Sequence, residues 1–125
     1  MGSRGSFLES GGFRTPAQWH TVDYVDGIKV LKPKNPKASL NLPERSNTPG
    51  TAYLLYRENG DFAQLRVFGE NRKPEFDIDY GVHAGKKSLH VHYYTEGVRG
   101  KYPEILHYND PLYEKYKTLF KGVER

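Results

Sequence analysis

Hydrophobic and polar residues alternate along several short stretches of this chain, and the alternation predicts β-strands. Residues 75–80 (EFDIDY) and 88–94 (SLHVHYY) switch between apolar and polar at nearly every position, as strands with one buried face do. Residues 51–58 (TAYLLYRE) and 62–68 (FAQLRVF) are strand-like runs on either side of an Asn-Gly dipeptide, which favours a hairpin turn. These four runs predict an antiparallel meander.

A weaker hairpin precedes the meander. Residues 19–25 and 28–31 are β-prone and flank Asp26-Gly27, and a two-residue Asp-Gly link favours a turn that needs positive φ. Residues 32–50 contain four prolines and predict a long loop between the hairpin and the meander.

The apolar period changes near the C-terminus and predicts a helix. Asn109 or Asp110 can cap it, and Pro111 falls at the first helical position, where its missing N–H costs nothing. Apolar residues then repeat at helical spacing, and Gly122 ends the pattern: Leu112, Tyr116, Leu119 and Phe120. The predicted fold class is α+β, an antiparallel β-meander sheet with a C-terminal helix packed on one face.

The 125 residues predict a single domain over 15–125, with 1–14 as a flexible Gly/Ser-rich lead-in. The lead-in lacks the apolar segment of a signal peptide, and no apolar run approaches the roughly 20 residues of a membrane span. We therefore expect no membrane partner. The chain has no cysteine, which excludes disulfides, thiol nucleophiles and cysteine-based zinc sites. Its net charge of +4 suits RNA, although many proteins without a polyanionic partner are equally basic.

The two alternating strands carry acidic and histidine side chains on their polar faces. Asp77 and Asp79 share one face of EFDIDY, and His90 and His92 share one face of SLHVHYY, because strand side chains alternate with a period of two. Pairing with the apolar faces aligned puts Asp79 opposite His90 and Asp77 opposite His92, with Cβ atoms about 5 Å apart.

A predicted loop over residues 81–88 joins these strands and adds His83 near its start. Three of the five histidines of the chain therefore fall within ten positions. Solvated sheet faces also carry polar residues, but this concentration of a scarce residue type favours a functional site.

Two chemistries fit this set. In the first, one histidine acts as general base and another as general acid, with the aspartates fixing their tautomers, as in metal-free cleavage of RNA. In the second, the histidines and aspartates ligate a divalent metal, since an H-x-H pair on a strand presents both imidazoles on one face: His90, His92, Asp77 and Asp79. The spacing is compatible with both, and the basic charge favours the first, which needs no cofactor.

Cations and tyrosines near this face are candidates for binding the substrate. Arg66 on the neighbouring strand is placed to hold a phosphate, and Tyr94 to stack on a base. The full set of candidate substrate-binding residues is Arg66, Tyr80, Lys86, Lys87, Tyr94 and Arg99.

Four motifs, DGIKVLK, SNTPGT, ENRKPEFDIDYG and LHVH, fall within residues 25–92. In them the chain resembles small proteins and C-terminal modules encoded in prophages and mobile elements of Gram-positive bacteria. Some such modules resemble the toxin tips of polymorphic toxins that have a ribonuclease fold like that of barnase or EndoU. Residue by residue, the resemblance points to Asp77, Asp79, Tyr80, His83, His90 and His92.

Two functions follow as hypotheses. The first is a metal-independent, toxin-like ribonuclease encoded by a phage or mobile element, acting in the cytoplasm of a bacterial host or associated with the phage. The second is a non-enzymatic phage accessory or protein-binding module, whose Asp/His cluster is a contact surface or a divalent-metal site. The expected partner of a ribonuclease is RNA. A phage structural or immunity protein is the other expected partner.

Overall fold

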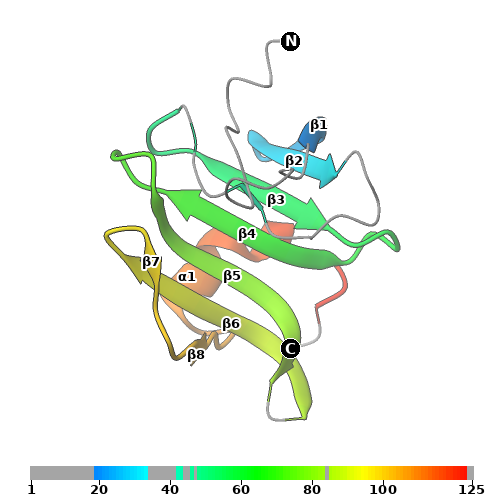
Figure 1. Cartoon of the computed structure of the whole chain (residues 1–125). Helices are drawn as coiled ribbons and strands as arrows, with labels where there is room; N and C mark the ends of the chain where they lie inside the picture. Colours follow the sequence, from blue (N-terminus) through cyan, green and yellow to red (C-terminus); the bar gives the residue numbers. More distant parts are fainter. Residues whose placement is uncertain (1–18, 34–41, 44–45, 47, 84, 124–125) are drawn as a thin grey trace.

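The computed structural model describes residues 19–33, 42–43, 46, 48–83 and 85–123. The predicted lead-in and much of the predicted loop over 32–50 lie outside these residues. Eight strands form one curved sheet (Figure 1). In chain order they are β1 (Trp19–Val25), β2 (Ile28–Pro33), β3 (Ala52–Tyr56), β4 (Phe62–Phe68), β5 (Pro74–His83), β6 (Lys86–Thr95), β7 (Val98–Arg99) and β8 (Glu104–Ile105).

The strands are neighbours in the order of the chain from β1 to β7, and β8 pairs with β6. All pairs are antiparallel except β2 and β3, which run parallel with Lys29 opposite Tyr53. The sheet is therefore mixed, and the prediction of a wholly antiparallel meander is wrong at this pair. Parallel neighbours need a crossover connection, and the residues between β2 and β3 are numerous enough to make one.

Two-residue turns close two of the hairpins. Asp26 and Gly27 have φ of 51° and 79° and join β1 to β2, as the Asp-Gly dipeptide predicts. Glu96 and Gly97 have φ of 53° and 79° and join β6 to β7 in the same way. This second turn was not predicted, and it places β7 beside the strand that carries the histidines.

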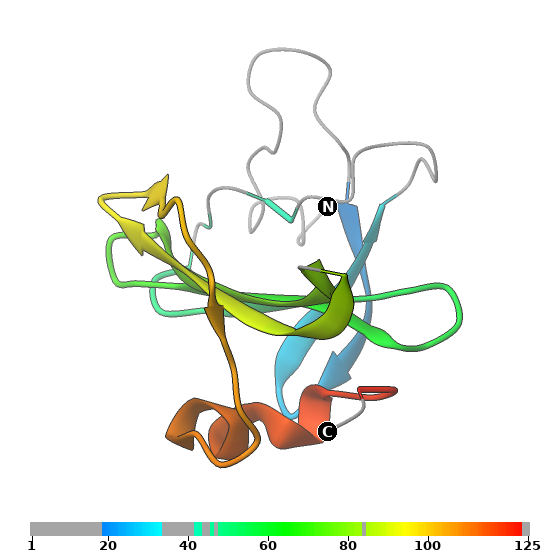
Figure 2. The ribbon, with the colours of Figure 1, turned by 90° about the horizontal axis from the view of Figure 1, so that it is seen from below.

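One face of the sheet packs against the C-terminal helical segment, which consists of α1 (Pro111–Tyr116) and a 3₁₀ turn, η2 (Lys117–Leu119) (Figure 2). The helix is shorter than the apolar pattern predicts. Asp110 is at its N-cap, but the carboxylate accepts the backbone N–H of His107 and caps no helical N–H. Among the described residues, no helix is both long and apolar enough to cross a membrane.

The main core lies between this segment and the sheet. Its buried members come from β2 to β6, the segment after β7 and the C-terminal turn: Val30, Leu54, Phe62, Leu65, Ile78, Tyr80, Leu89, Val91, Leu106, Leu119 and Phe120. A smaller apolar cluster lies on the opposite face of β1 to β4: Trp19, Leu31, Leu42, Tyr53, Leu55 and Phe68. The polar side chains of β5 and β6 continue that second face.

We expect Ile78→Ala to lower the free energy of unfolding by about 2–5 kcal/mol, because Ile78 is fully buried at the centre of the main core. The matched control is Val82→Ala on the same strand, where the side chain is 73% exposed and the change should stay within about 0.5 kcal/mol. Urea denaturation of both variants measures this. Equal losses would contradict the burial of Ile78 in the main core and the exposure of Val82.

Candidate functional site

The pairing of β5 with β6 brings the aspartates and histidines together. Asp77 lies opposite His92 and Asp79 lies opposite His90, so the predicted register is confirmed. The predicted loop over residues 81–88 is wrong, because both strands extend into this range, β5 as far as His83 and β6 from Lys86 onward. His83 ends β5 opposite Lys86 in the ladder.

Asp77 is the buried centre of a hydrogen-bond network on this face. It has no solvent exposure, and Arg66 binds it with two parallel hydrogen bonds, Nε to Oδ1 at 2.8 Å and Nη2 to Oδ2 at 3.0 Å. The Tyr94 hydroxyl donates to Oδ2 at 2.7 Å, and the amide of Gln64 donates at 3.3 Å. Asp77 is therefore committed to contacts within the protein.

Arg66 is equally committed. Its Nη1 donates to the carbonyls of Leu42 at 2.6 Å and Pro43 at 3.1 Å, and its Nη2 also donates to the Tyr94 hydroxyl at 3.2 Å. With the two bonds to Asp77, these contacts use the five N–H donors of a guanidinium. Burial opposes the charge of Arg66, but the hydrogen bonds and charge of Asp77 outweigh it and raise the pKa of Arg66. The structure thus gives Arg66 a supporting position, with no N–H left for a substrate phosphate.

Asp79 differs from Asp77 because it reaches the surface, with 25% of its side chain exposed. Oδ2 of Asp79 is 2.9 Å from Nη2 of Arg99 and 3.5 Å from Nε2 of His92. Burial raises the pKa of Asp79 from 3.8 to about 6, with a further contribution from the charge of Asp77, while Arg99 and Arg66 act in the opposite direction. Asp79 can therefore exchange a proton near neutral pH.

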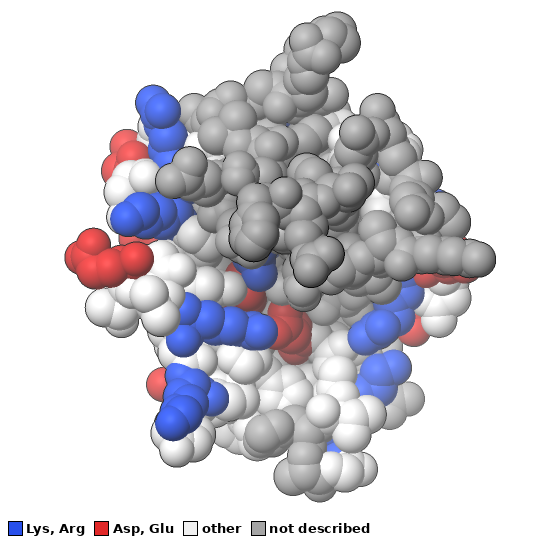
Figure 3. Space-filling view, viewed as in Figure 1, with Lys and Arg blue, Asp and Glu red and all other residues white. Residues whose placement is uncertain are grey.

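Arg99, one of the candidate substrate-binding residues from the sequence, lies beside Asp79. It comes from β7, where it pairs with Tyr94 of β6, and 45% of its side chain is exposed. Its Nη2 also lies 4.0 Å from Oδ2 of Asp77. On the face seen in Figure 3, acidic side chains near the middle of the surface lie beside basic ones. Arg99 thus has an exposed guanidinium next to the Asp79 carboxylate.

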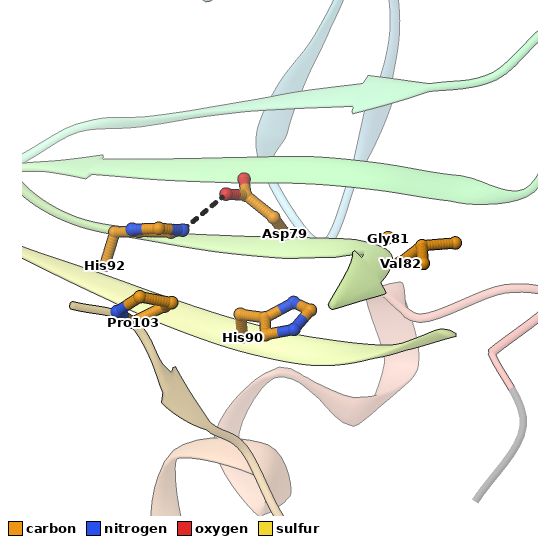
Figure 4. Close-up of a pocket in the computed structure, with 6 residues that line it drawn as sticks. All are labelled: Asp79, Gly81, Val82, His90, His92 and Pro103. Carbon is orange, nitrogen blue, oxygen red and sulfur yellow. Dashed lines mark ion pairs between the residues drawn. The ribbon is translucent and has the colours of Figure 1, made fainter. Parts of the chain in front are cut away.

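An open pocket of about 360 Å³ lies over this part of the sheet. Figure 4 shows His92, paired with Asp79, at the same end as Pro103, the imidazole of His90 in the middle, and Gly81 and Val82 at the other end. His90 is buried, and its Nε2 lies 3.3 Å from the Ser88 hydroxyl. The pocket is lined by Asp79, Gly81, Val82, His90, His92 and Pro103.

The other candidate residues from the sequence fall elsewhere. Tyr80 is buried in the main core, with the ammonium of Lys87 4.9 Å from the centre of its ring, so both belong to the helix side of the sheet. Lys86 is exposed at the start of β6, and the hydroxyl of Tyr94 is part of the Asp77 network. Within the described part of the chain, no three His, Asp or Glu side chains are placed to hold a metal ion together.

Sequence reasoning missed Gly81, Val82 and Pro103 as pocket residues. It also assigned the phosphate to Arg66 and named Arg99 only as a further candidate. The Glu-Gly dipeptide at 96–97 was the sequence signal that could have placed Arg99 near Asp79. A hairpin turn at this dipeptide folds the chain back, so that Arg99 lies opposite Tyr94 of β6. Pro103 has no such local signal, since the chain after β7 brings it to the pocket.

We expect Arg66→Met to lower the free energy of unfolding by about 3–5 kcal/mol, because it leaves the charge of Asp77 buried without its main partner. Arg99→Met removes the same charge from a half-exposed position and should cost less than about 1 kcal/mol. Chemical denaturation compares the two. Similar losses would contradict the separate positions assigned to these arginines.

Asp79 should titrate in the folded protein with a midpoint near pH 6, which carboxyl-carbon NMR measures directly. Because this folded pKa lies above the unfolded value of about 3.9, the stabilisation from protonated Asp79 is complete below about pH 4 and is lost as the pH rises through 6. Asp79→Asn should not lose stability over this pH range. Arg99→Met, which keeps Asp79, should raise the titration midpoint of Asp79, because Arg99 lowers its pKa. A wild-type midpoint near 4 would refute the assignment.

Comparisons with protein-family models, with curated proteins and with solved structures find no match to this chain. Function is therefore inferred from the chemistry of the pocket. Two imidazoles and one carboxylate with a raised pKa line this small open space, and a half-exposed guanidinium lies beside the carboxylate.

Proposed function

We propose that this protein cleaves RNA without a metal ion, as a toxin-like ribonuclease of a phage or mobile element. The observation that carries the proposal is the pocket in which His90, His92 and Asp79 lie together beside the exposed guanidinium of Arg99. Cleavage of RNA transfers a phosphoryl group from the 5′-oxygen to the 2′-oxygen. Two imidazoles can serve as the base and the acid of this transfer, and a cation can hold the phosphate.

In the proposed reaction, one imidazole accepts the proton of the ribose 2′-hydroxyl as the O2′–P bond forms. The other imidazole donates a proton to the 5′-oxygen as the P–O5′ bond breaks, which leaves a 2′,3′-cyclic phosphate and a free 5′-hydroxyl. His90 and His92 are two residues apart on β6, so their side chains leave the same face of the strand. They can therefore act on the two sides of one bound phosphate.

Asp79 supports His92 in this proposal. A carboxylate 3.5 Å from Nε2 of His92 can orient the ring and stabilise the positive charge that an imidazole gains when it accepts a proton in the reaction. Because the pKa of Asp79 is raised to about 6, this support is strongest above that pH, where the carboxylate is charged. Asp79 is thus a positioning residue for His92.

Arg99 holds the phosphate in this proposal, in place of the buried Arg66. Its guanidinium has five N–H donors and is half-exposed, so it can keep its bond to Asp79 and still offer donors to a phosphate oxygen. The proposal therefore assigns the two arginines different tasks. Arg66 supports the sheet face, and Arg99 binds substrate.

We expect purified protein to cleave single-stranded RNA in the presence of EDTA and to leave 2′,3′-cyclic phosphate ends. His90→Ala and His92→Ala should each lower the rate by about 10²–10⁴-fold, the usual contribution of a general acid or base. On a substrate with a p-nitrophenolate leaving group, the variant that lacks the general acid should recover most of its rate, because that group leaves without a proton. Electrophoresis and product mass spectrometry report both results.

The matched control is His107→Ala, which removes an exposed imidazole outside the pocket and should cleave at the wild-type rate. RNA left equally intact by the wild type and both pocket variants would end the proposal and favour a non-enzymatic binding module. Cleavage that EDTA abolishes would end the metal-free mechanism and keep the site.

A further inference from the structure

Gly81 leaves a gap in the pocket that a side chain would fill. It follows Asp79 by two residues on β5, so a side chain there would leave the same face as Asp79. No described atom lies within 4 Å of a Cβ built on Gly81. Its φ lies outside the left-handed region, so the backbone does not require glycine. Neither steric crowding nor backbone conformation therefore explains why this position has no side chain.

The gap lies at one end of the acid–base group. In Figure 4, Gly81 and Val82 lie on the side of His90 away from Pro103. Gly81 pairs with Ser88, whose hydroxyl is 3.3 Å from Nε2 of His90. A group held over Gly81 would therefore lie next to the bond on which His90 acts. Val82, which is 73% exposed, also lines that end of the pocket.

We propose that the space over Gly81 receives one unpaired nucleobase next to the scissile phosphate, so that the substrate is single-stranded RNA. This inference rests on the proposed ribonuclease activity. The pocket volume of about 360 Å³ is near the lower end of small-ligand sites, which suits one nucleotide. A flat base can lie over the backbone of Gly81, whereas a Cβ with further carbons would occupy that space.

Base pairing decides which RNA can enter. A base in a duplex is stacked and paired, and proteins read A-form RNA by its shape and backbone, whereas an unpaired base can turn outward into a pocket. The subsite over Gly81 therefore selects for loops and single strands. It also places the base, and through it the ribose 2′-hydroxyl, beside the imidazoles.

The test compares wild type with Gly81→Leu on four RNA substrates. The first is a single strand with a defined cleavage position, and the second is the same strand in a duplex. The other two are single strands with an abasic ribose on the 5′ side or on the 3′ side of that position. We expect wild type to cleave the single strand and to lose rate on the duplex and on one abasic version. Gly81→Leu should lower kcat/KM on the base-containing strand about tenfold or more, as the loss of pocket contacts does. On the abasic RNA that wild type cleaves more slowly, the kcat/KM of Gly81→Leu should match that of wild type within about threefold, because this substrate has no base for the leucine to exclude.

Thr95→Leu is the matched control, because it adds a leucine at an exposed position of β6 outside the pocket and should cleave like wild type. Thermal unfolding of Gly81→Leu checks the fold, and Gly81→Ala, a smaller change, is expected to lose less activity in the same pattern. Equal cleavage of the base-containing strand by wild type and Gly81→Leu would overturn the subsite while the ribonuclease stands. A wild type that cleaves no RNA would overturn the ribonuclease itself.

Discussion

The register of β5 against β6 is the constraint on which the rest of this protein depends. Both strands alternate apolar and polar side chains, so one register gives one face to the core and the other to the pocket. A slip by a single residue would expose Ile78 and bury Asp79 under the helix. The helical segment closes over the apolar face of these strands, and Arg66, from the adjacent β4, holds the opposite face through Asp77. The pocket and the core are thus two consequences of one pairing.

Two aspartates that look equivalent in the sequence become different groups on this sheet. Asp77 accepts hydrogen bonds from Arg66, Tyr94 and Gln64, and it has no contact with solvent. Asp79, two residues later on the same face, meets Arg99 and His92 at the edge of the pocket, and burial raises its pKa to about 6. Position relative to the neighbouring strands separates them. The arginine of β4 meets Asp77 in the ladder, while the arginine of β7 reaches Asp79 from outside.

Local patterns predicted most of the strands, the β5–β6 register and the two pairs of facing residues, because alternation and turn dipeptides are properties of a few neighbouring positions. They could not predict the parallel β2–β3 pair, since its direction depends on a connection between distant residues. They also could not show that Arg66 is saturated. Its Nη1 binds the carbonyls of Leu42 and Pro43, and no periodicity relates those residues to β4. The pocket was predicted in its histidines and Asp79, while Pro103 depends on the path of the chain after β7.

The Arg66–Asp77 pair is better explained by its position than by its contribution to stability. Buried ion pairs are costly to desolvate, and well-packed apolar residues of similar volume often stabilise a protein as much or more. An apolar pair, however, would place no charge beside Asp79. The charge of Asp77 adds to burial in raising the pKa of Asp79, and the hydrogen bonds of Arg66 fix where that charge lies. Arg66 acts in the opposite direction and lowers the pKa of Asp79, and burial remains the largest cause of its rise. The pair therefore adjusts, with two opposing charges, the pKa of the carboxylate that contacts His92, and this links a buried interaction on β4 and β5 to the chemistry proposed for the pocket.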